Sequence, residues 1–493
     1  MLYNSFAFIF VFLPVVFLVY FFLNRRRYTM LGKFWLVISS LLFYSWWNIN
    51  YLPLILLSIL VNYFLGKIIQ RDNIFNSKSV LLIGLIFNLG LLGYFKYTNF
   101  FIHNVNTLFA TNQSLLELSL PLAISFFTFQ QIAYIVDIYK KEIKSSNLLN
   151  YAFFVTFFPQ LIAGPIVHHK ELIPQFSNLR KKLVNYRFVT LGIFLFSIGL
   201  FKKVILADSF SIWASQGFDQ LKVVTFIEVW VISLSYTFQI YFDFSGYMDM
   251  AIGAALLFNI TLPWNFNSPY KATNIQDVWN KWHMTLGRFL YRYLYMPLNK
   301  YLLRKVFTPL GLKDKVNVRT SISLILMFLI SGLWHGAGWT FIFWGFLHGM
   351  ATVVHRYWKL TKIRMNNVLA WFITFNFINF TMVFFRAETF PDAIKILRGM
   401  IGLNGLTLPE RFEELFPTHF KSIITFDNLP LNDTIGALQY ILVGFIIILC
   451  FKNTKQLSDT FKPTLWSFIL CIFLILYSIL NLTRVSEFIY FNF

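Results

Sequence analysis

The sequence predicts an all-α polytopic membrane protein with about 11–13 transmembrane or re-entrant helices and no large soluble domain. Two observations indicate this fold class. The 493 residues are 57% hydrophobic and only 13% charged, whereas soluble domains carry about 25% charged residues. Apolar runs long enough to cross a hydrocarbon layer of about 30 Å recur from one end of the chain to the other. A set of soluble domains is therefore excluded.

The chain is strongly basic, with a formal net charge of +21. Lys and Arg gathered in cytoplasmic loops explain this balance, so we expect membrane lipid as the surroundings and no nucleic-acid partner. The two cysteines, Cys450 and Cys471, lie in apolar segments. They form neither a disulfide framework nor a zinc site, and no metal is expected.

The N-terminal half alternates apolar runs with basic loops. The first run, residues 6–23, has no positive charge before it and "NRRR" directly after it. This is the reverse of a cleaved signal peptide, so we expect a retained helix with the N-terminus outside. The run at 151–167 breaks at "AGP" and indicates a short or re-entrant helix.

The C-terminal half contains the largest basic block of the chain. Charge again sets the expected topology, which places the C-terminus outside. The expected segments are an outward span at 188–206, one or two returning helices at 226–258, a basic amphipathic segment on the cytoplasmic face at 271–319, a hairpin at 320–357, an external loop at 386–433, a last span at 465–482 and an external tail at 484–493.

The stretch "LISGLWHGAGW" places His335 at the apex of the expected hairpin. An imidazole in hydrocarbon needs a partner or a water-filled cavity, which makes His335 a functional candidate. Gly332, Gly336 and Gly338 let the backbone pack closely or turn there. The alternative is a packing histidine that is hydrogen-bonded to a neighbouring helix.

The stretch "QDVWNKWHMTLGRFLYRYLYMPL", residues 276–298, is expected to form one amphipathic helix. Such a helix usually means interfacial anchoring. Anchoring does not account for His283, which falls on the aromatic face rather than with the basic residues. The aromatic face carries Trp279, Trp282 and His283, and another face carries Lys281, Arg288 and Arg292.

The remaining candidates are weaker. His168, His169 and His355 are expected to be solvated at the cytoplasmic edge, and His348 lies thirteen residues after His335, on a different face of any shared helix. Asp243 enters an apolar segment, where it orients a histidine or backbone, caps a helix or pairs two helices. Walker, GxGxxG and GxSxG patterns are absent from the sequence, which gives no support to nucleotide-driven transport or a hydrolase elbow.

Several motifs in order carry a resemblance to a known family. They include "FFPQLIAGPIVHHKELIPQF" (157–176), "QIYFDFSGYMDMAIG" (239–253), "GLWHGAGWTFIFWGFLHG" (332–349) and the terminal "FIYFNF" (488–493). With these motifs the chain resembles the membrane-bound O-acyltransferases, and within them the bacterial branch that O-acetylates alginate and peptidoglycan. The resemblance covers most of the chain and implies a single membrane domain in the bacterial cytoplasmic (inner) membrane.

The resemblance implies a funnel that an acyl donor enters from the cytoplasm and an acceptor from outside. In it, His335 is the essential histidine and His283 the second signature histidine. The donor is expected to be acetyl-CoA or an acyl-carrier thioester, with no bound cofactor, and the hairpin glycines would leave room for an acyl chain. The candidates for contacts with donor or tunnel are Trp279, Asn280, Trp282, Arg288, Arg292, Trp334, Gly336 and Asp243.

The expected function is O-acetylation of an extracytoplasmic polysaccharide, with His335 as general base. Tyr490 in the external tail is a candidate acyl relay to a periplasmic or membrane-anchored Ser/His/Asp (SGNH-type) O-acetyltransferase, or else an aromatic-belt anchor. Arg288 and Arg292 could steer a phosphate-rich donor. A transporter, a scaffold of a polysaccharide export complex and teichoic acid D-alanylation remain as alternatives.

Overall fold

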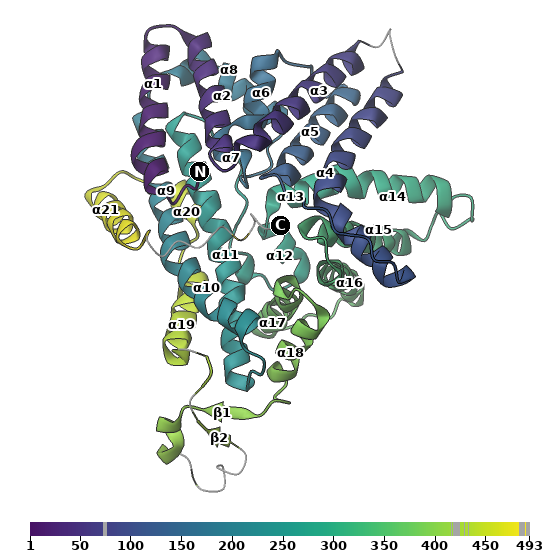
Figure 1. Ribbon diagram of the computed structural model, residues 1–493, viewed down its shortest axis with the longest axis vertical. Coiled ribbons are helices and arrows are strands. Elements are labelled where there is room, and N and C mark those ends of the chain that lie inside the picture. Colours follow the sequence, from purple (N-terminus) through teal and green to yellow (C-terminus); the bar gives the residue numbers. More distant parts are fainter. Residues whose placement is uncertain are drawn as a thin grey trace.

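The computed structural model describes residues 1–71, 76–415, 417, 424–427, 429–431, 433–482 and 489 (Figure 1). These residues are almost entirely helical. The elements are α1 (Leu13–Arg25), α2 (Thr29–Ser45), α3 (Leu52–Gln70), α4 (Ser77–Phe109), α5 (Ile124–Tyr139), α6 (Leu148–Thr156), α7 (Phe158–Leu161), α8 (His169–Ser177), α9 (Tyr186–Phe201), α10 (Asp208–Ser215), α11 (Phe226–Leu257), α12 (Ile275–Lys281), α13 (Met284–Leu290), α14 (Met296–Leu302), α15 (Val316–His335), α16 (Trp339–Thr361), α17 (Asn367–Arg386), α18 (Phe390–Met400), β1 (Leu406–Leu408), β2 (Ile424–Phe426), α19 (Thr434–Cys450), α20 (Thr454–Asp459) and α21 (Leu465–Leu480).

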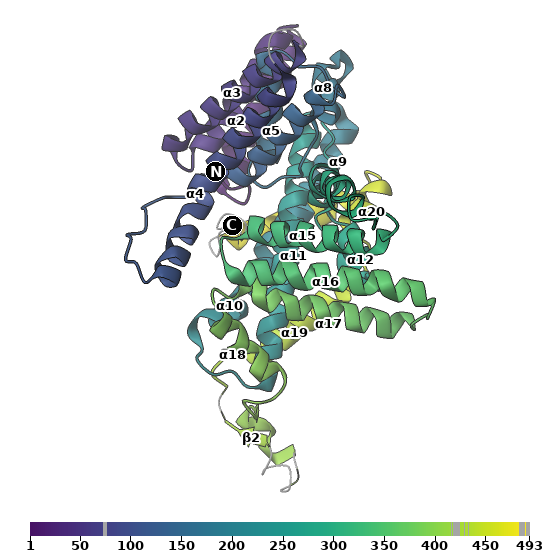
Figure 2. The same ribbon diagram turned by 90° about the vertical axis from the view of Figure 1, so that its right-hand side faces the viewer.

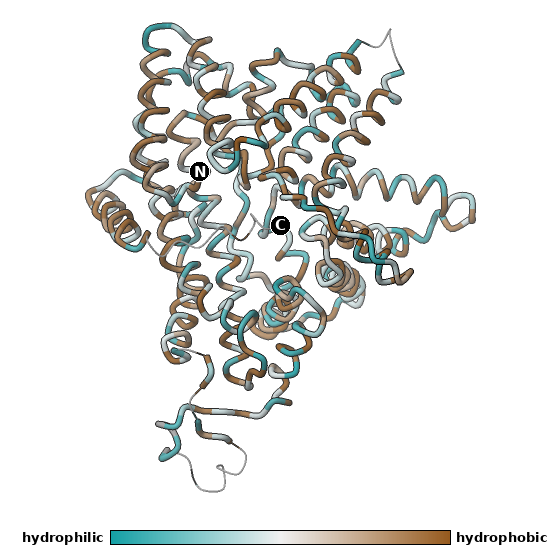
Figure 3. The backbone as a smooth tube through the Cα atoms, viewed as in Figure 1, coloured by the Kyte–Doolittle hydropathy of each residue, from teal (hydrophilic) through white to brown (hydrophobic). Residues whose placement is uncertain are grey.

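The all-α polytopic membrane fold is confirmed. Among the described residues, six helical segments are long and apolar enough to cross a membrane, and three shorter apolar helices accompany them. In four of the six spans only 22–39% of the apolar stretch is buried inside the protein, so most of its side chains face outward; in Tyr186–Gln220 and Asn367–Arg386 the buried share is 56% and 50%. The tube in Figure 3 is accordingly hydrophobic along peripheral helices such as α1 and α21. A surface of this kind is stable only in lipid. The six spans are Ala7–Arg25, Ile49–Gln70, Ser77–Phe109, Tyr186–Gln220, Val316–His335 and Asn367–Arg386.

The long helix α11 runs through the centre of the molecule (Figure 1). It is one helix of 32 residues, begun by a capping box in which Thr225 and Glu228 bond each other's backbone N–H groups. Almost all of its side chains are buried, and it carries Glu228, Asp243 and Asp249. It is therefore a central helix packed on protein. With its polar and charged residues, it is not among the six helical segments that are apolar enough to cross a membrane.

Paired glycines bring α9 and α11 together. A Cβ atom added to Gly253 would lie 2.6 Å from the carbonyl oxygen of Gly192, and one added to Gly199 would lie 2.5 Å from that of Gly246. No side chain fits at either contact. The two backbones touch directly, as small-residue seams allow in membrane proteins.

Glycines also join the two arms of the hairpin formed by α15 and α16. A Cβ atom on Gly332 would lie 2.2 Å from the carbonyl oxygen of Phe341, and one on Gly336 would lie 2.2 Å from the Phe341 ring. At Gly332 and Gly336 the expected room for an acyl chain is missing, because Phe341 of α16 fills the space beside them. Figure 2 shows α15, α16 and α17 running side by side.

The expected continuous helix over 276–298 is also wrong. Helix α12 ends at Lys281 and α13 begins at Met284, and His283 between them has a left-handed backbone with φ of 43°. Asn265, from the preceding loop, holds this break. Its side-chain oxygen accepts bonds from the Thr285 backbone N–H at 3.0 Å and the Thr285 hydroxyl at 2.9 Å. Its main-chain oxygen accepts from Met284 N. These bonds offset the roughly 1–2 kcal/mol that a left-handed residue costs.

The segment expected as an external loop, 386–433, has structure of its own. It begins with α18, which packs against α11 and α17. Strands β1 and β2 then form a short parallel pair with Leu406 opposite Ile424. The broken run at 151–167 contains the short helices α6 and α7.

Candidate active site

His335 is the last residue of α15 and is surrounded by aromatic rings. It is 3% exposed. Its ring centroid is 4.8 Å from that of Trp334, and 5.2 Å from those of Trp344 and Phe385. These three rings come from α15, α16 and α17. The imidazole is thus placed where the hairpin meets the next helix, shielded from bulk solvent.

His283 reaches the same region from the break between α12 and α13. It is 1% exposed and packs edge-on against Phe244 of α11, with ring centroids 4.8 Å apart. Its Nδ1 lies 3.2 Å from the side-chain oxygen of Asn265, so the Nδ1–H donates and Nε2 carries the free lone pair. Trp334 lies near both histidines, since its ring is also 6.5 Å from that of His283. The structure therefore brings the two predicted histidines together around Trp334.

A third buried histidine joins this cluster. His348 lies on α16, with its ring 4.6 Å from Trp344 and 5.1 Å from Trp279, and its Nε2 is 3.1 Å from the Thr381 hydroxyl. His335 and His348 stand on the two arms of a hairpin, so they share no helix and their spacing along the sequence does not separate them. The sequence "WGFLHG" offers no signal beyond its apolar context.

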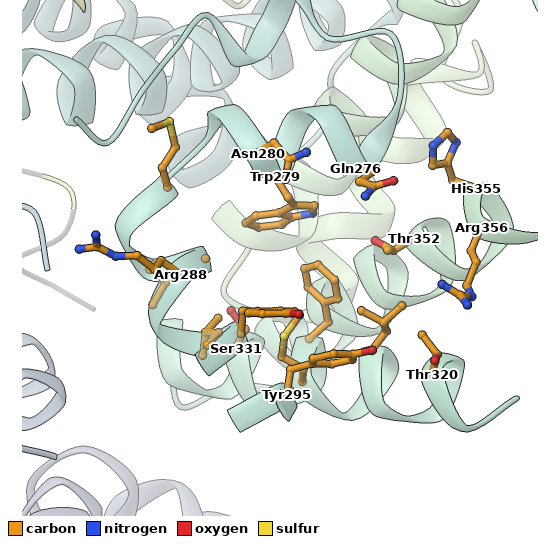
Figure 4. Close-up of a pocket in the computed structure, with 18 of the residues that line it drawn as sticks. Gln276, Trp279, Asn280, Arg288, Tyr295, Thr320, Ser331, Thr352, His355 and Arg356 are labelled. Atoms are coloured by element: carbon orange, nitrogen blue, oxygen red, sulfur yellow. The ribbon is translucent and has the colours of Figure 1, made fainter. Parts of the chain in front are cut away.

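A cavity of about 680 Å³ lies one helical turn away from both predicted histidines. Ser331, four residues before His335, and Gly287, four residues after His283, line it. Figure 4 shows Trp279 and Asn280 on one wall and Ser331 and Tyr295 on the opposite wall, with His355 and Arg356 at one end. Of the expected donor contacts, Trp279, Asn280 and Arg288 line this cavity. Trp282, Trp334, Gly336, Arg292 and Asp243 do not line it.

One end of the cavity is positively charged. Arg356 donates to the side-chain oxygen of Asn317 at 2.8 Å, and Lys359 donates to that of Gln276 at 2.8 Å. Both partners are neutral amides, and no carboxylate of the described residues forms an ion pair with either cation. Their charge is therefore available to an anionic ligand.

Arg288 and Arg292, in contrast, already have acidic partners. Arg288 forms a bidentate pair with Glu171, with N–O distances of 2.6 and 3.0 Å. Arg292 binds Asp137 at 3.1 Å and also contacts Glu142. The Arg288 pair connects α13 to α8, and the Arg292 pair connects the π-helical turn after α13 (Tyr291–Tyr295) to α5. Both pairs leave little charge for steering a donor.

The expectation that His168 and His169 are solvated is wrong. They are 2% and 7% exposed. The ring of His168 lies 3.1 Å from the Tyr293 hydroxyl, which donates to Asp137 at 2.7 Å. Burial, together with the nearby Arg288, lowers the pKa of His168 to about 4. The ring is therefore neutral at pH 7 and belongs to the ion-pair network of Asp137.

Asp243 binds the C-terminal tail and a buried lysine. Lys203 lies 2.8 Å from Asp243 Oδ1 and 2.8 Å from Asp208 Oδ1. The backbone N–H of Ile489 donates to Asp243 Oδ2 at 2.9 Å. The tail thus returns to α11 at Ile489. Tyr490, the candidate relay residue, lies outside the described residues. Among the described residues, no three His, Cys, Asp or Glu side chains come together as metal ligands.

The fold defines a polytopic helical membrane protein, and it buries the candidate histidine pair inside the helical bundle. Comparison with known proteins supplies the family. The membrane-bound O-acyltransferase family matches residues 138–299 and 296–387. The chain belongs to this family and is an O-acyltransferase.

Three relatives show where the chain lies within the family. It is 46% identical over its whole length to a peptidoglycan O-acetyltransferase of Helicobacter pylori, of which 98% is covered. It is 37% identical to the probable alginate O-acetylase of Pseudomonas aeruginosa, over 83% of this chain and 76% of that protein. Its identity to the teichoic acid D-alanyltransferase of Bacillus subtilis is 26%, over 55% of this chain and 69% of that protein.

The ion pair of Arg292 with Asp137 predicts a stability defect. Replacing Arg292 by Gln leaves Asp137, which is 1% exposed, without its cation. We expect the free energy of unfolding to fall by about 2–3 kcal/mol, below the roughly 3–5 kcal/mol typical of fully buried pairs because Arg292 is 26% exposed. Thermal unfolding of the purified protein in detergent, followed by tryptophan fluorescence, measures this.

Lys281→Gln is the matched control for Arg292→Gln. Lys281 pairs with Asp277 at 2.7 Å, but both side chains are about one-third exposed, and an exposed pair contributes about 0–1 kcal/mol. An equal loss of stability in the two variants would contradict a structural role for the Arg292 pair.

Proposed function

We propose that this O-acyltransferase moves an acetyl group from a cytosolic thioester to an extracytoplasmic polysaccharide, with peptidoglycan as the first candidate acceptor. Identity of 46% along the full length to a peptidoglycan O-acetyltransferase supports that choice. Alginate-like exopolysaccharide is the second candidate, on the basis of the 37% identical alginate relative. The location is the bacterial cytoplasmic membrane, with both termini outside.

The observation that carries the proposal is the cavity beside the histidine pair. It is apolar along most of its length, ends one turn from His335 and His283, and has His355, Arg356 and Lys359 at one end. A thioester donor such as acetyl-CoA, or the phosphopantetheine arm of a carrier, combines phosphate with a thin acyl-bearing arm. The cationic end suits the phosphates, and the apolar part suits the arm and its acetyl group.

His335 acts in this proposal as general base. Its imidazole takes the proton of the acceptor hydroxyl while the hydroxyl oxygen attacks the thioester carbonyl carbon. The C–S bond then breaks, and the proton on the imidazole passes to the leaving thiolate. Atoms and charge balance without any cofactor. His283, whose Nδ1–H is held by Asn265, orients the donor or stabilises the oxyanion near Trp334.

The acceptor hydroxyl that reaches His335 belongs, in this proposal, to Tyr490. The residue before Tyr490, Ile489, donates its backbone N–H to Asp243 on the central helix. Asp243 precedes Phe244, whose ring packs against His283, and this supports the choice of Tyr490. Transfer to a tethered hydroxyl is effectively intramolecular. An aryl ester is a good acyl donor, and a periplasmic or membrane-anchored Ser/His/Asp O-acetyltransferase would take the acetyl group onward to the polymer.

Other functions have less support. D-alanylation of teichoic acid corresponds to the relative with 26% identity over about half of this chain. A transporter or a scaffold would not require His335. The variants below separate these alternatives from the enzyme.

Loss of His335 should abolish transfer. We expect His335→Ala and His335→Gln to reduce acetyl transfer by about 100-fold or more, since a general base contributes 10²–10⁴-fold. The measurement is acetyl content of purified peptidoglycan and exopolysaccharide, by mass spectrometry, in a deletion strain that expresses each variant. Membrane immunoblots check that the variants accumulate. Normal acetylation by His335→Ala would favour the scaffold or transporter.

Charge reversal at the cationic end of the cavity should weaken donor binding. Arg356→Glu and Lys359→Glu are each expected to raise the KM for the donor by roughly two- to fivefold, with kcat little changed. The difference from wild type should shrink at high salt because screening weakens exposed charge interactions. Lys300→Glu, an exposed lysine of α14 away from the cavity, is the control. Equal KM values for all three variants would argue against this donor path.

The relay hypothesis depends on one hydroxyl group. Tyr490→Phe keeps the ring and removes the acceptor, so polymer acetylation should fall to the level of the His335 variants. Tyr477→Phe, an exposed tyrosine of α21, should leave it unchanged. Polymer acetylation at the wild-type rate in Tyr490→Phe would make Tyr490 a membrane anchor.

A further inference from the structure

Helix α15 ends at the catalytic candidate His335, and all four of its last carbonyl groups have donors. The final four carbonyls of a helix have no partner within the helix. Here Gly336 N donates to Gly332 O at 3.3 Å, and the Tyr97 hydroxyl donates to Leu333 O at 3.0 Å. Lys96 Nζ contacts Trp334 O and donates to His335 O at 3.2 Å. Three of the four carbonyls are therefore bonded by two residues of another helix, Lys96 and Tyr97 of α4.

The side of α4 that carries Lys96 also contacts the turn that joins α15 to α16, and Figure 2 shows α4 beside that turn. Phe100 packs on Trp339 with ring centroids 5.8 Å apart, and Asn104 Oδ1 accepts from the Trp339 indole N–H at 2.9 Å. Lys96, Phe100 and Asn104 are spaced by four residues, so they lie along one helical stripe. The contact of α4 with the apex of the hairpin is thus continuous over more than two turns.

Lys96 differs from Lys202 and Lys203, two other lysines of the interior. Lys202 and Lys203 have carboxylate partners, Asp249 at 2.7 Å and Asp243 at 2.8 Å. Among the described residues, no carboxylate forms an ion pair with Lys96. Its ammonium group instead bonds the two carbonyls and lies 5.7 Å from the centroid of the Trp334 ring. A cation at this place also compensates the negative end of the α15 dipole.

We propose that Lys96 and Tyr97 are positioning residues for the acyl transfer: from α4 they cap the C-terminal end of α15 and thereby hold His335 in place. This inference rests on the proposed role of His335. A carbonyl without a donor in an apolar surrounding costs roughly 1–3 kcal/mol. Without the cap the last turn of α15 would fray or twist toward other donors. The imidazole is carried by that turn, and a shift of about 1 Å in a catalytic group can reduce the rate 100-fold.

Because no carboxylate of the described residues pairs with Lys96, a positioning role of Lys96 can be distinguished from a role in folding. Lys96→Met removes the donor and leaves no buried acid unpaired, so the protein should still fold. Lys203→Met, in contrast, removes the ammonium group that lies 2.8 Å from both Asp208 and Asp243, and this variant should unfold at a clearly lower temperature. Lys96→Met should therefore lose activity while it keeps its stability, whereas Lys203→Met should lose stability.

The experiment compares purified Lys96→Met, Lys96→Arg, Tyr97→Phe and Lys78→Met with wild type, measuring donor kcat, donor KM and thermal unfolding. We expect Lys96→Met to lose about 10–100-fold in kcat with donor KM within about twofold of wild type. Lys96→Arg, which can still donate to both carbonyls, should recover most of the loss, and Tyr97→Phe should lose less than Lys96→Met. Lys78→Met, the same change at an exposed position of α4, should match wild type.

Three results would overturn the proposal. They are a wild-type kcat in Lys96→Met, a loss that Lys96→Arg does not recover, or a loss in Lys96→Met that goes with unfolding as severe as in Lys203→Met. His335→Ala, assayed in parallel, distinguishes this failure from that of the function itself. If His335→Ala is inactive while Lys96→Met is fully active, only the positioning role is lost. If His335→Ala is active, the proposed chemistry fails whatever Lys96 does.

Discussion

A helix that ends among apolar groups leaves carbonyls that water cannot reach, and α15 ends in this way at His335. The carbonyls must be bonded by protein, because each unsatisfied group in an apolar layer costs several kcal/mol. Helix α4 supplies those donors through Lys96 and Tyr97, and α16 closes against α15 through Gly332. The histidine that the family resemblance marks as essential is therefore held from two sides. Rings from α16 and α17 complete its surroundings.

The same requirement recurs through the interior. Several polar groups that cannot reach water are paired with one another between helices far apart in the sequence. Asn62 and Asn88 exchange two hydrogen bonds, of 3.1 and 2.6 Å, between α3 and α4. Asp137 on α5 forms an ion pair with Arg292 and accepts a hydrogen bond from the Tyr293 hydroxyl, and both partners belong to the turn after α13. Because such pairs work only in one alignment, they fix the order in which the outer helices surround α11.

The sequence predicted the all-helical membrane fold, because that fold depends on a local pattern, the long apolar runs. It also singled out His335 and His283 within apolar or aromatic stretches, and the structure buries both near Trp334. It missed the break at His283, since the group that stabilises it, Asn265, lies eighteen residues earlier in a loop without periodicity. It also treated Arg288 as free charge, because Glu171 is distant along the chain. His348 was misjudged for a related reason, as helical spacing says nothing about residues on opposite arms of a hairpin.

The paired glycines of α9 and α11 have a mechanical consequence. Gly192 meets Gly253 and Gly199 meets Gly246, and the two contacts are seven residues apart on each helix. Sliding either helix by one turn would press a side chain against a carbonyl oxygen at both points. The two helices are thus locked against sliding and move as one rigid body.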